Sequence, residues 1–182
     1  MVVMDSTTLM LLIDPEAKPP QDPKTRKPVQ KSKERIEYLL ETLNASRTQV
    51  LVPTPVLSEV LIRAGAAKGQ YLNEISGSYA LRIASFDQRA AIELSMLFDS
   101  DLNKFKKLTD IQTKAKIKFD RQIVAIAKVN GVKTIYSDDG GLAIVAKQNG
   151  ISVVPTWDLP LRPVKAQAEL EFGQAPGDRS RS

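Results

Sequence analysis

The sequence predicts an α/β domain built on a parallel sheet with helices on both faces. Short apolar segments of strand length recur along the chain, and stretches with the apolar spacing of helices separate them. This alternation is typical of parallel sheets, whose strands are buried on both faces and joined by helices. The chain has 182 residues, about the length of one ordinary domain, so we expect one core.

Five segments have the length and composition of buried strands. They are VVM (2–4), QVLV (49–52), YALRIAS (79–85), VKTIY (132–136) and ISVV (151–154). Pro53 and Pro155 directly follow the second and the fifth segment. Proline lacks the N–H that a central strand needs, so we expect both strands to end there.

Helical patterning fills much of the chain between these strands. After Ser32, apolar residues recur at the spacing of a stripe that packs on a sheet: Ile36, Leu39, Leu40 and Leu43. Thr54 and Pro55 are typical of an N-cap and a first helical residue, and they predict a helix that runs to Gly65. The other predicted helices run from the first strand to Ile13, from Asp87 to about Phe98, up to Gly131, and over 140–149.

Two segments depart from the alternation. Residues 14–30 hold five prolines, which exclude a helix or a central strand and predict a long exposed excursion. After Pro155 the pattern stops. We therefore predict a domain over 1–156 and a C-terminal extension over 157–182 with a disordered end.

The composition excludes several chemistries. The chain has no histidine and no cysteine, so it has no Ser-His-Asp or Cys-His nucleophile, no zinc site with His or Cys ligands, and no disulfide. Any metal must bind to oxygen. Phosphate-binding loops of the G-x-x-x-x-G-K-[ST] and G-x-G-x-x-G types are absent, and Thr7 stands where an aspartyl-phosphate phosphatase needs a second Asp.

Positive charge is concentrated in two segments. The net charge is +5, and residues 18–35 carry seven basic and two acidic side chains, while residues 101–121 carry seven and three. This pattern fits a polyanionic partner, and it fits solvated loops and helix faces equally well. No apolar run approaches the length of a membrane span, and the N-terminus has an acid where a signal peptide needs basic residues. We expect a cytoplasmic protein without a membrane partner.

Carboxylates with apolar neighbours are the candidate site residues. Asp5 directly follows the first strand, and Asp138 and Asp139 follow the fourth. Glu59 lies one turn into the helix after the second strand, and Asp120 lies on the apolar face of a helix. In open parallel sheets, ligands bind beyond the carboxyl ends of the strands. Buried carboxylates that lie close together repel one another unless a cation bridges them, and Mg²⁺ or Mn²⁺ suits oxygen ligands.

Each of these acids also has a structural interpretation. Asp5 could cap the helix that follows it, and Glu59 could be a first-turn acid favoured by the helix dipole. Asp120 could pair with Lys116 or Arg121. The pair 138–139 could belong to a plain turn.

Taken together, these residues resemble the PIN-domain nucleases. The motifs are VVMDSTTL, VPTPVLSEVL, FDRQIVAIAKVNG and IYSDDGGL, in that order over residues 1–156. The resemblance implies a three-layer α/β/α sandwich whose five-stranded parallel sheet has the order 3-2-1-4-5. It also implies a catalytic quartet of Asp5, Glu59, Asp120 and Asp139, with Ser137 as a supporting hydroxyl and Asp138 as an extra acid.

The implied reaction is hydrolysis of RNA phosphodiester bonds with Mg²⁺ or Mn²⁺. Asp5, Asp120, Asp139 and Asp138 are the candidate metal ligands, and Glu59 is a ligand or orients the attacking water. Basic side chains must offset the repulsion between these acids and a phosphate backbone. The candidates are Lys104, Lys106, Lys107, Lys114, Lys116, Lys118 and Arg121, together with the lysines of the insertion.

Within the family, the chain most resembles the VapC-type toxins of toxin–antitoxin pairs. This resemblance implies an endoribonuclease that a small antitoxin protein blocks, and a homodimer. The insertion at 14–30 and the tail depart from compact members of this group. A stand-alone RNA-processing nuclease, a catalytically silent module that binds RNA or protein, and action on single-stranded DNA remain as alternatives.

Overall fold

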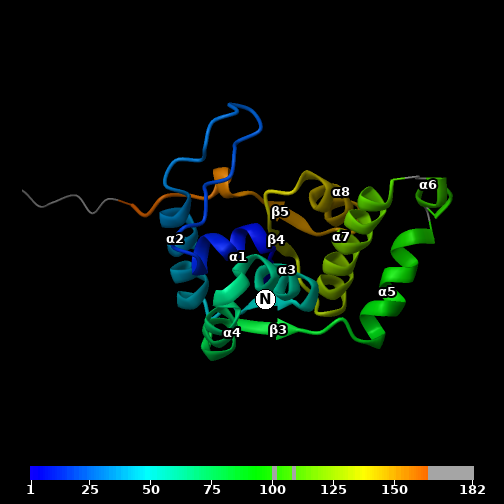
Figure 1. Ribbon diagram of the computed structural model, residues 1–182, viewed down its shortest axis with the longest axis horizontal. Coiled ribbons are helices and arrows are strands. Elements are labelled where there is room, and N and C mark those ends of the chain that lie inside the picture. The colour runs from blue at the N-terminus through cyan, green and yellow to red at the C-terminus, as the bar shows by residue number, and fades with distance from the viewer. Residues whose placement is uncertain (100–101, 108–109, 164–182) are drawn as a thin grey trace, which may run out of the picture.

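The computed structural model describes residues 1–99, 102–107 and 110–163, and it contains a five-stranded sheet between layers of helices (Figure 1). The strands are β1 (Val2–Met4), β2 (Val50–Pro53), β3 (Leu81–Ala84), β4 (Thr134–Tyr136) and β5 (Ser152–Val154). All of the pairings are parallel, and the order is β3-β2-β1-β4-β5. The predicted fold class and strand order are confirmed.

The central strand explains where the candidate acids meet. Val3 of β1 lies opposite Leu51 of β2 on one side and opposite Ile135 of β4 on the other. All three of these side chains are fully buried, as expected for the middle of a sheet covered on both faces. Asp5 follows directly, and its N–H donates to the Tyr136 carbonyl at 3.0 Å. The residues after β1 and after β4 are thereby brought to the same edge.

Helices α1 to α8 connect the strands. They are α1 (Ser6–Ile13), α2 (Ser32–Ala45), α3 (Thr54–Ala64), α4 (Lys68–Gly77), α5 (Gln88–Asp99), α6 (Leu102–Lys107), α7 (Ile111–Val129) and α8 (Gly140–Gln148), with short 3₁₀ turns η1 (Gly65–Ala67) and η2 (Thr156–Asp158). The sequence patterns did not predict α4 or α6. No helix in the described ranges is both long and apolar enough to cross a bilayer.

The start of α3 differs from the expectation by one residue. Pro53 is the N-cap and Thr54 is already helical, so the prediction of Thr54 as the N-cap is wrong. The Thr54 hydroxyl instead accepts the N–H of Phe86 at 3.0 Å. This contact joins the start of α3 to the segment after β3, so a tertiary hydrogen bond takes the place of a local cap.

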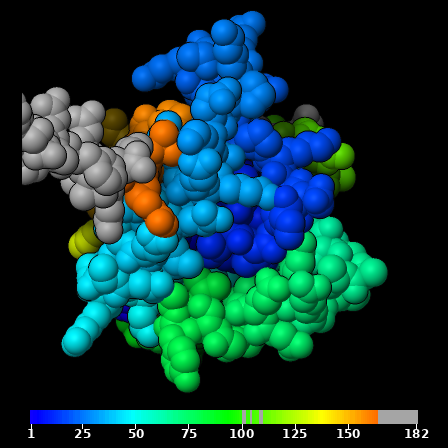
Figure 2. Space-filling model, turned by 90° about the vertical axis from the view of Figure 1, so that its left-hand side faces the viewer, coloured from blue at the N-terminus to red at the C-terminus, as the bar shows by residue number. Residues whose placement is uncertain are grey.

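Residues 14–31, here named the basic arm, leave the body of the protein between α1 and α2. They contain no helix and no strand of the sheet, as the prolines predicted. Figure 2 shows the arm standing clear of the surrounding surface, above α2. Residues 157–163 of the predicted extension pack beside α2, where Leu159 is buried and Arg162 pairs with Glu41. The rest of that extension, 164–182, lies outside the described residues.

Candidate active site

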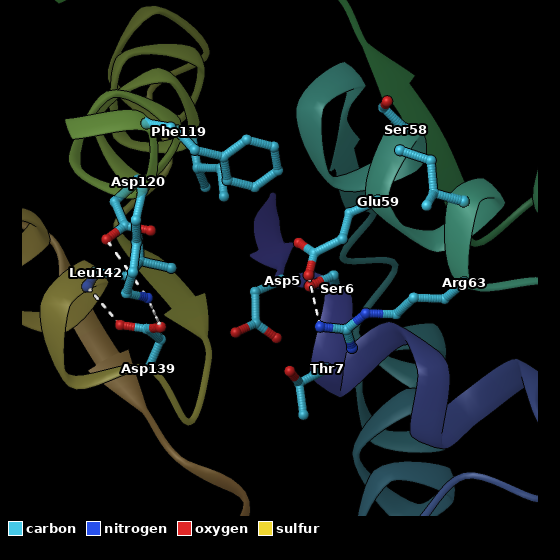
Figure 3. A pocket seen from close by; sticks show the side chains of 14 residues that line it. Asp5, Ser6, Thr7, Ser58, Glu59, Arg63, Phe119, Asp120, Asp139 and Leu142 are labelled. Carbon is cyan, nitrogen blue, oxygen red and sulfur yellow. Dashed lines mark hydrogen bonds and ion pairs between the residues drawn. The ribbon is translucent and has the colours of Figure 1, made fainter. Parts of the chain in front are cut away.

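A cavity of about 470 Å³ opens at the carboxyl edge of the sheet. Figure 3 shows Asp5 between two walls, with Asp120 and Asp139 on one side and Glu59 on the other. The four carboxylates come from four different elements: the end of β1, α3, α7 and the start of α8. The other lining residues are Ser6, Thr7, Ser58, Ile62, Arg63, Ala115, Lys116, Phe119, Ile123 and Leu142.

Asp5 is held by both of its carboxylate oxygens. Oδ1 accepts the N–H of Thr8 at 2.8 Å and so caps α1, while Oδ2 accepts the hydroxyl of Ser137. Burial raises the pKa of Asp5 to about 6, although these hydrogen bonds oppose the shift. Asp5 therefore caps α1 and also lines the cavity.

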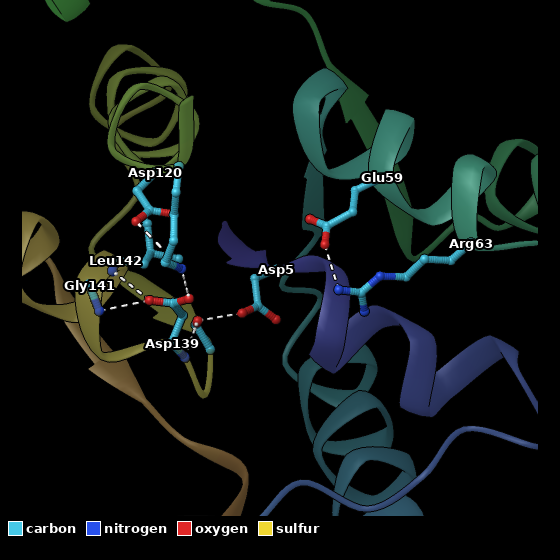
Figure 4. Close-up of polar contacts among 9 residues, drawn as sticks. Asp5, Glu59, Arg63, Asp120, Asp139, Gly141 and Leu142 are labelled. Atoms are coloured by element: carbon cyan, nitrogen blue, oxygen red, sulfur yellow. Dashed lines mark hydrogen bonds and ion pairs between the residues drawn. The ribbon is translucent and has the colours of Figure 1, made fainter. Parts of the chain in front are cut away.

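Asp139 is also both a cap and a wall of the cavity. Its Oδ1 accepts the N–H groups of Gly141 at 2.7 Å and Leu142 at 3.1 Å, which caps α8 (Figure 4). Its Oδ2 forms an ion pair with Lys116. Burial raises the pKa of Asp139, but the Lys116 hydrogen bond and the backbone N–H groups outweigh burial, so the pKa lies below its usual value.

Ser137 links the two strand-end acids. Its hydroxyl donates to Asp5 and accepts the N–H of Asp139 at 3.0 Å. The Ser137 side chain is almost fully buried. A single hydroxyl therefore contacts the carboxylate of Asp5 and the backbone of Asp139.

Asp120 lies on the buried face of α7, one turn after Lys116. Its Oδ2 is 4.0 Å from the Lys116 ammonium. Burial raises the pKa of Asp120 to about 6; Lys116 opposes this shift, and the nearby charges of Asp139 and Asp5 add to it. The charge of Glu59 also adds to this shift, so all three other acids of the quartet act on Asp120.

Gly141 lies beside one carboxylate oxygen of Asp120 and one of Asp139. A Cβ at this position would lie 3.1 Å from Asp120 Oδ2 and 3.1 Å from Asp139 Oδ1. Because both oxygens lie 3.1 Å from the same position, the distance between them is at most 2 × 3.1 Å. A side chain here would crowd both carboxylates, and glycine leaves the space between them open.

Glu59 faces Asp5 from the opposite wall of the cavity. Its Oε1 accepts a hydrogen bond from Arg63 Nη2 at 2.5 Å, one turn further along α3 (Figure 4). The Glu59 side chain is 31% exposed and that of Arg63 is 47% exposed. This pair lies at the mouth of the cavity and is free to rearrange at little cost.

Two cations of the chain pair with three acids of the quartet. Lys116 pairs with Asp139 and Asp120, and Arg63 pairs with Glu59. In the described part of the chain, no three acidic side chains stand close enough together to hold a metal ion in their present positions. The donor set still fits a hard cation, because all of its donors are oxygens and two of its acids have pKa values raised by burial and crowding.

The structure does not bring every predicted site residue to the cavity. Asp138 is absent from the lining, and both of its oxygens are engaged by Thr156, through the N–H at 2.6 Å and the hydroxyl at 2.8 Å. Of the two acids that follow β4, Asp139 is therefore the one that lines the cavity. The predicted roles of these residues in catalysis stay predictions.

The predicted RNA-binding side chains differ in their exposure. Lys106, Lys107 and Lys118 are exposed, and Lys114 is half-buried near the ring of Phe105. Arg121 is buried, with its guanidinium 4.1 Å from the ring centre of Phe98, so it is not presented to a surface ligand. The expectation of a surface role for Arg121 is thus corrected. The Lys104 side chain lies outside the described residues.

Sequence reasoning missed Arg63 and Phe119 as residues of the site. The spacing from Glu59 to Arg63 is that of neighbours on a helix face, and this signal was available. Phe119 precedes Asp120 and lines the cavity (Figure 3). Its apolar character pointed only to the core.

Comparisons with known proteins show a shared fold. No family model and no curated protein sequence matches the chain. A chain of the VapBC2 complex of Rickettsia felis, bound to a DNA fragment from its promoter, matches with a TM-score of 0.52 at 14% identity, over 85% of this chain and 98% of that one. A chain of DNA-bound VapBC from Salmonella typhimurium matches with a TM-score of 0.50 at 16% identity, over 85% and 97%. The chain therefore has the PIN-like α/β/α fold.

The raised pKa of Asp5 predicts a stability that falls with pH in metal-free protein. As the pH rises from about 4 to about 6, the unfolded chain ionises this group before the folded chain does. The free energy of unfolding should then fall by up to about 3 kcal/mol. The Asp5→Asn variant keeps a side-chain acceptor for the Thr8 N–H, and its free energy of unfolding should fall less over this range. The variant should be as stable as the parent near pH 4 and more stable than the parent at pH 7.5.

The measurement is urea unfolding in EDTA across this pH range. Asp158→Asn removes an exposed carboxylate outside the cavity and serves as the control. Parallel curves for the parent and Asp5→Asn would show that Asp5 is not held in a charge-disfavouring environment.

Proposed function

We propose that the chain is a metal-dependent ribonuclease that acts as the toxin of a toxin–antitoxin pair. The observation that carries the proposal is the convergence of Asp5, Glu59, Asp120 and Asp139 on one cavity from four separate elements. Burying several acids together is costly unless a cation compensates for their charges. A purely structural role would not need all four in one place.

Asp120, Asp139 and Asp5 would hold one or two Mg²⁺ or Mn²⁺ ions. Such an ion, when bound, lowers the pKa of a coordinated water and stabilises the charge that develops on the phosphate. Asp139 would have to release Lys116 to act as a ligand. Asp5 would keep its orientation through the hydrogen bond from Ser137, which is not a lining residue of the cavity.

Other residues of the cavity have roles toward the substrate. Glu59, once released by Arg63, would accept a proton or a hydrogen bond from the attacking water. Lys116 and Arg63 would then be available to a phosphate group at the mouth of the cavity. The ring of Phe119 offers a face on which an unpaired base can stack, which favours a single-stranded substrate.

Removal of the Asp120 charge should abolish cleavage of RNA and leave the fold intact. Asp120→Asn should lower kcat at least about 100-fold, because several kcal/mol of transition-state stabilisation are lost. The parent should cleave a labelled RNA in Mg²⁺ or Mn²⁺ and stop in EDTA. Asp158→Asn should cleave like the parent. Undiminished cleavage in EDTA would contradict a carboxylate–metal mechanism.

The toxin part of the proposal is supported by the kind of protein that shares the fold. Both matched structures contain VapBC complexes, and nearly the whole of each matched chain is covered. A small antitoxin would act by covering the acidic cavity. A basic side chain of the partner could replace Lys116 or Arg63 on the carboxylates, since both are more than 45% exposed at its mouth.

Expression of the chain alone should arrest growth through catalysis. Asp139→Asn removes one of the cavity acids and should relieve the arrest at equal protein level, as measured by growth curves and immunoblots. Charge reversal of exposed Lys106 and Lys107 should relieve it less. If the Asp139 variant stays toxic, the arrest does not come from this cavity. An active nuclease without a growth defect would point to stand-alone RNA processing.

A further inference from the structure

The basic arm is an ordered hairpin with its own hydrogen bonds. Gln21 and Pro28 form an antiparallel bridge, and the N–H of Asp22 donates to the Lys27 carbonyl at 3.0 Å. The N–H of Val29 donates to the Pro20 carbonyl at 2.8 Å. Val29 is 7% exposed and anchors the hairpin to the body of the protein. The arm is therefore held in a defined position and is more than an irregular connection.

The charges of the hairpin tip point to solvent. Lys24, Arg26 and Lys27 are exposed, and none of them forms an ion pair with another described residue. Asp22 is the acid of this tip, and it turns inward: Oδ1 accepts the N–H of Lys24 at 2.8 Å and Oδ2 accepts the hydroxyl of Thr25 at 3.1 Å. The tip therefore keeps a surplus of positive charge at the surface: three cations stand against one acid, Asp22, whose charge interacts with that of Lys24.

Arg26 occupies a backbone conformation that ordinarily favours glycine. Its φ is +56°, in the left-handed region. The turn is closed by the Arg26 N–H, which donates to the Asp22 carbonyl at 2.8 Å. Glycine would adopt this turn more readily. Replacement of Arg26 by glycine would therefore suit the turn and remove only the side chain.

We propose that the basic arm binds the phosphate backbone of RNA at a place separate from the cavity. The arm contributes no residue to the cavity lining. None of the large hydrophobic side chains that are exposed in the described part of the chain lies in the arm. Specific protein interfaces need apolar or aromatic anchors, and membrane surfaces need apolar residues that insert. A surplus of exposed cations without apolar neighbours fits a phosphate backbone.

The arm would supply an attraction that the cavity lacks. The acids of the cavity repel a phosphate backbone, whereas the arm attracts one in a way that does not depend on sequence. This inference rests on the proposed function for the identity of the nucleic acid as RNA. Binding by the arm and cleavage at the cavity involve different residues, so each can fail without the other.

The test is RNA binding by arm variants at several salt concentrations. The probe is a fluorescein-labelled single-stranded oligoribonucleotide, bound to the full chain carrying Asp120→Asn in EDTA and followed by anisotropy. The arm variant carries Lys24→Gln, Arg26→Gly and Lys27→Gln. The matched control loses three exposed lysines elsewhere and has the same net charge: Lys68→Gln, Lys133→Gln and Lys147→Gln.

The arm variant should lose both affinity and salt dependence. Each phosphate contact contributes about 0.7 to the slope of log K against log salt, so loss of three contacts should reduce the slope by about 2 and raise Kd about fivefold per contact at 0.1 M salt. The control should stay within about twofold of the parent. Equal Kd values and slopes for the arm variant and the control would overturn the proposal.

Two further measurements separate the competing explanations. Arg26→Gly alone suits the positive φ, so a weaker RNA complex at an unchanged melting temperature would exclude misfolding of the arm. Polyglutamate serves as an anionic protein probe, and an equal loss of its binding in the arm variant would overturn the assignment to nucleic acid. Cleavage of RNA by the parent is measured separately. Arm-dependent RNA binding without any cleavage would support the proposed role of the arm and contradict the proposed nuclease activity.

Discussion

Electrostatic repulsion among the carboxylates of the cavity is the constraint on which the site depends. Asp5 and Asp120 are both buried, and the negative charge of Asp5 adds to the effect of burial in raising the pKa of Asp120. Lys116 and Arg63 reduce the repulsion because they place positive charge directly on Asp139 and Glu59. The hydrogen bond to Asp139 raises the pKa of Lys116, which therefore stays charged. These ion pairs are the contacts that a metal or a partner would have to replace.

The same acids also hold the backbone in place. Asp5 caps α1 and Asp139 caps α8, so the two helices begin where the site needs its carboxylates. One oxygen of Asp139 is committed to the backbone N–H groups, and the other stays directed at Lys116. Because capping fixes the side-chain orientation, little conformational entropy remains to be lost when a ligand binds. Folding and the arrangement of the site are therefore coupled through single residues.

Much of this arrangement could be predicted from the sequence, because the signals are local. Apolar runs marked the five strands, and Asp120 stood out as an acid on an apolar helix face. Helix α4 was not predicted, because Tyr71 and Ile75 are its only buried residues and two apolar positions give a weak helical pattern. The residue pattern alone did not separate Asp138 from Asp139, and only the family resemblance assigned Asp139 to the quartet. The structural difference between the two acids depends on Thr156, which lies 18 residues further on and donates hydrogen bonds to Asp138. Likewise, the tertiary contact between Thr54 and Phe86 decided where α3 begins.

The metal site is tested most directly by locating Mn²⁺ in crystals of the parent protein from its anomalous scattering. We expect a peak between Asp120 and Asp139, within reach of Asp5, with the Lys116 ammonium displaced from Asp139. A peak elsewhere with the Lys116–Asp139 pair intact, or no peak at a Mn²⁺ concentration that supports cleavage, would contradict the assignment of this cavity as the metal site.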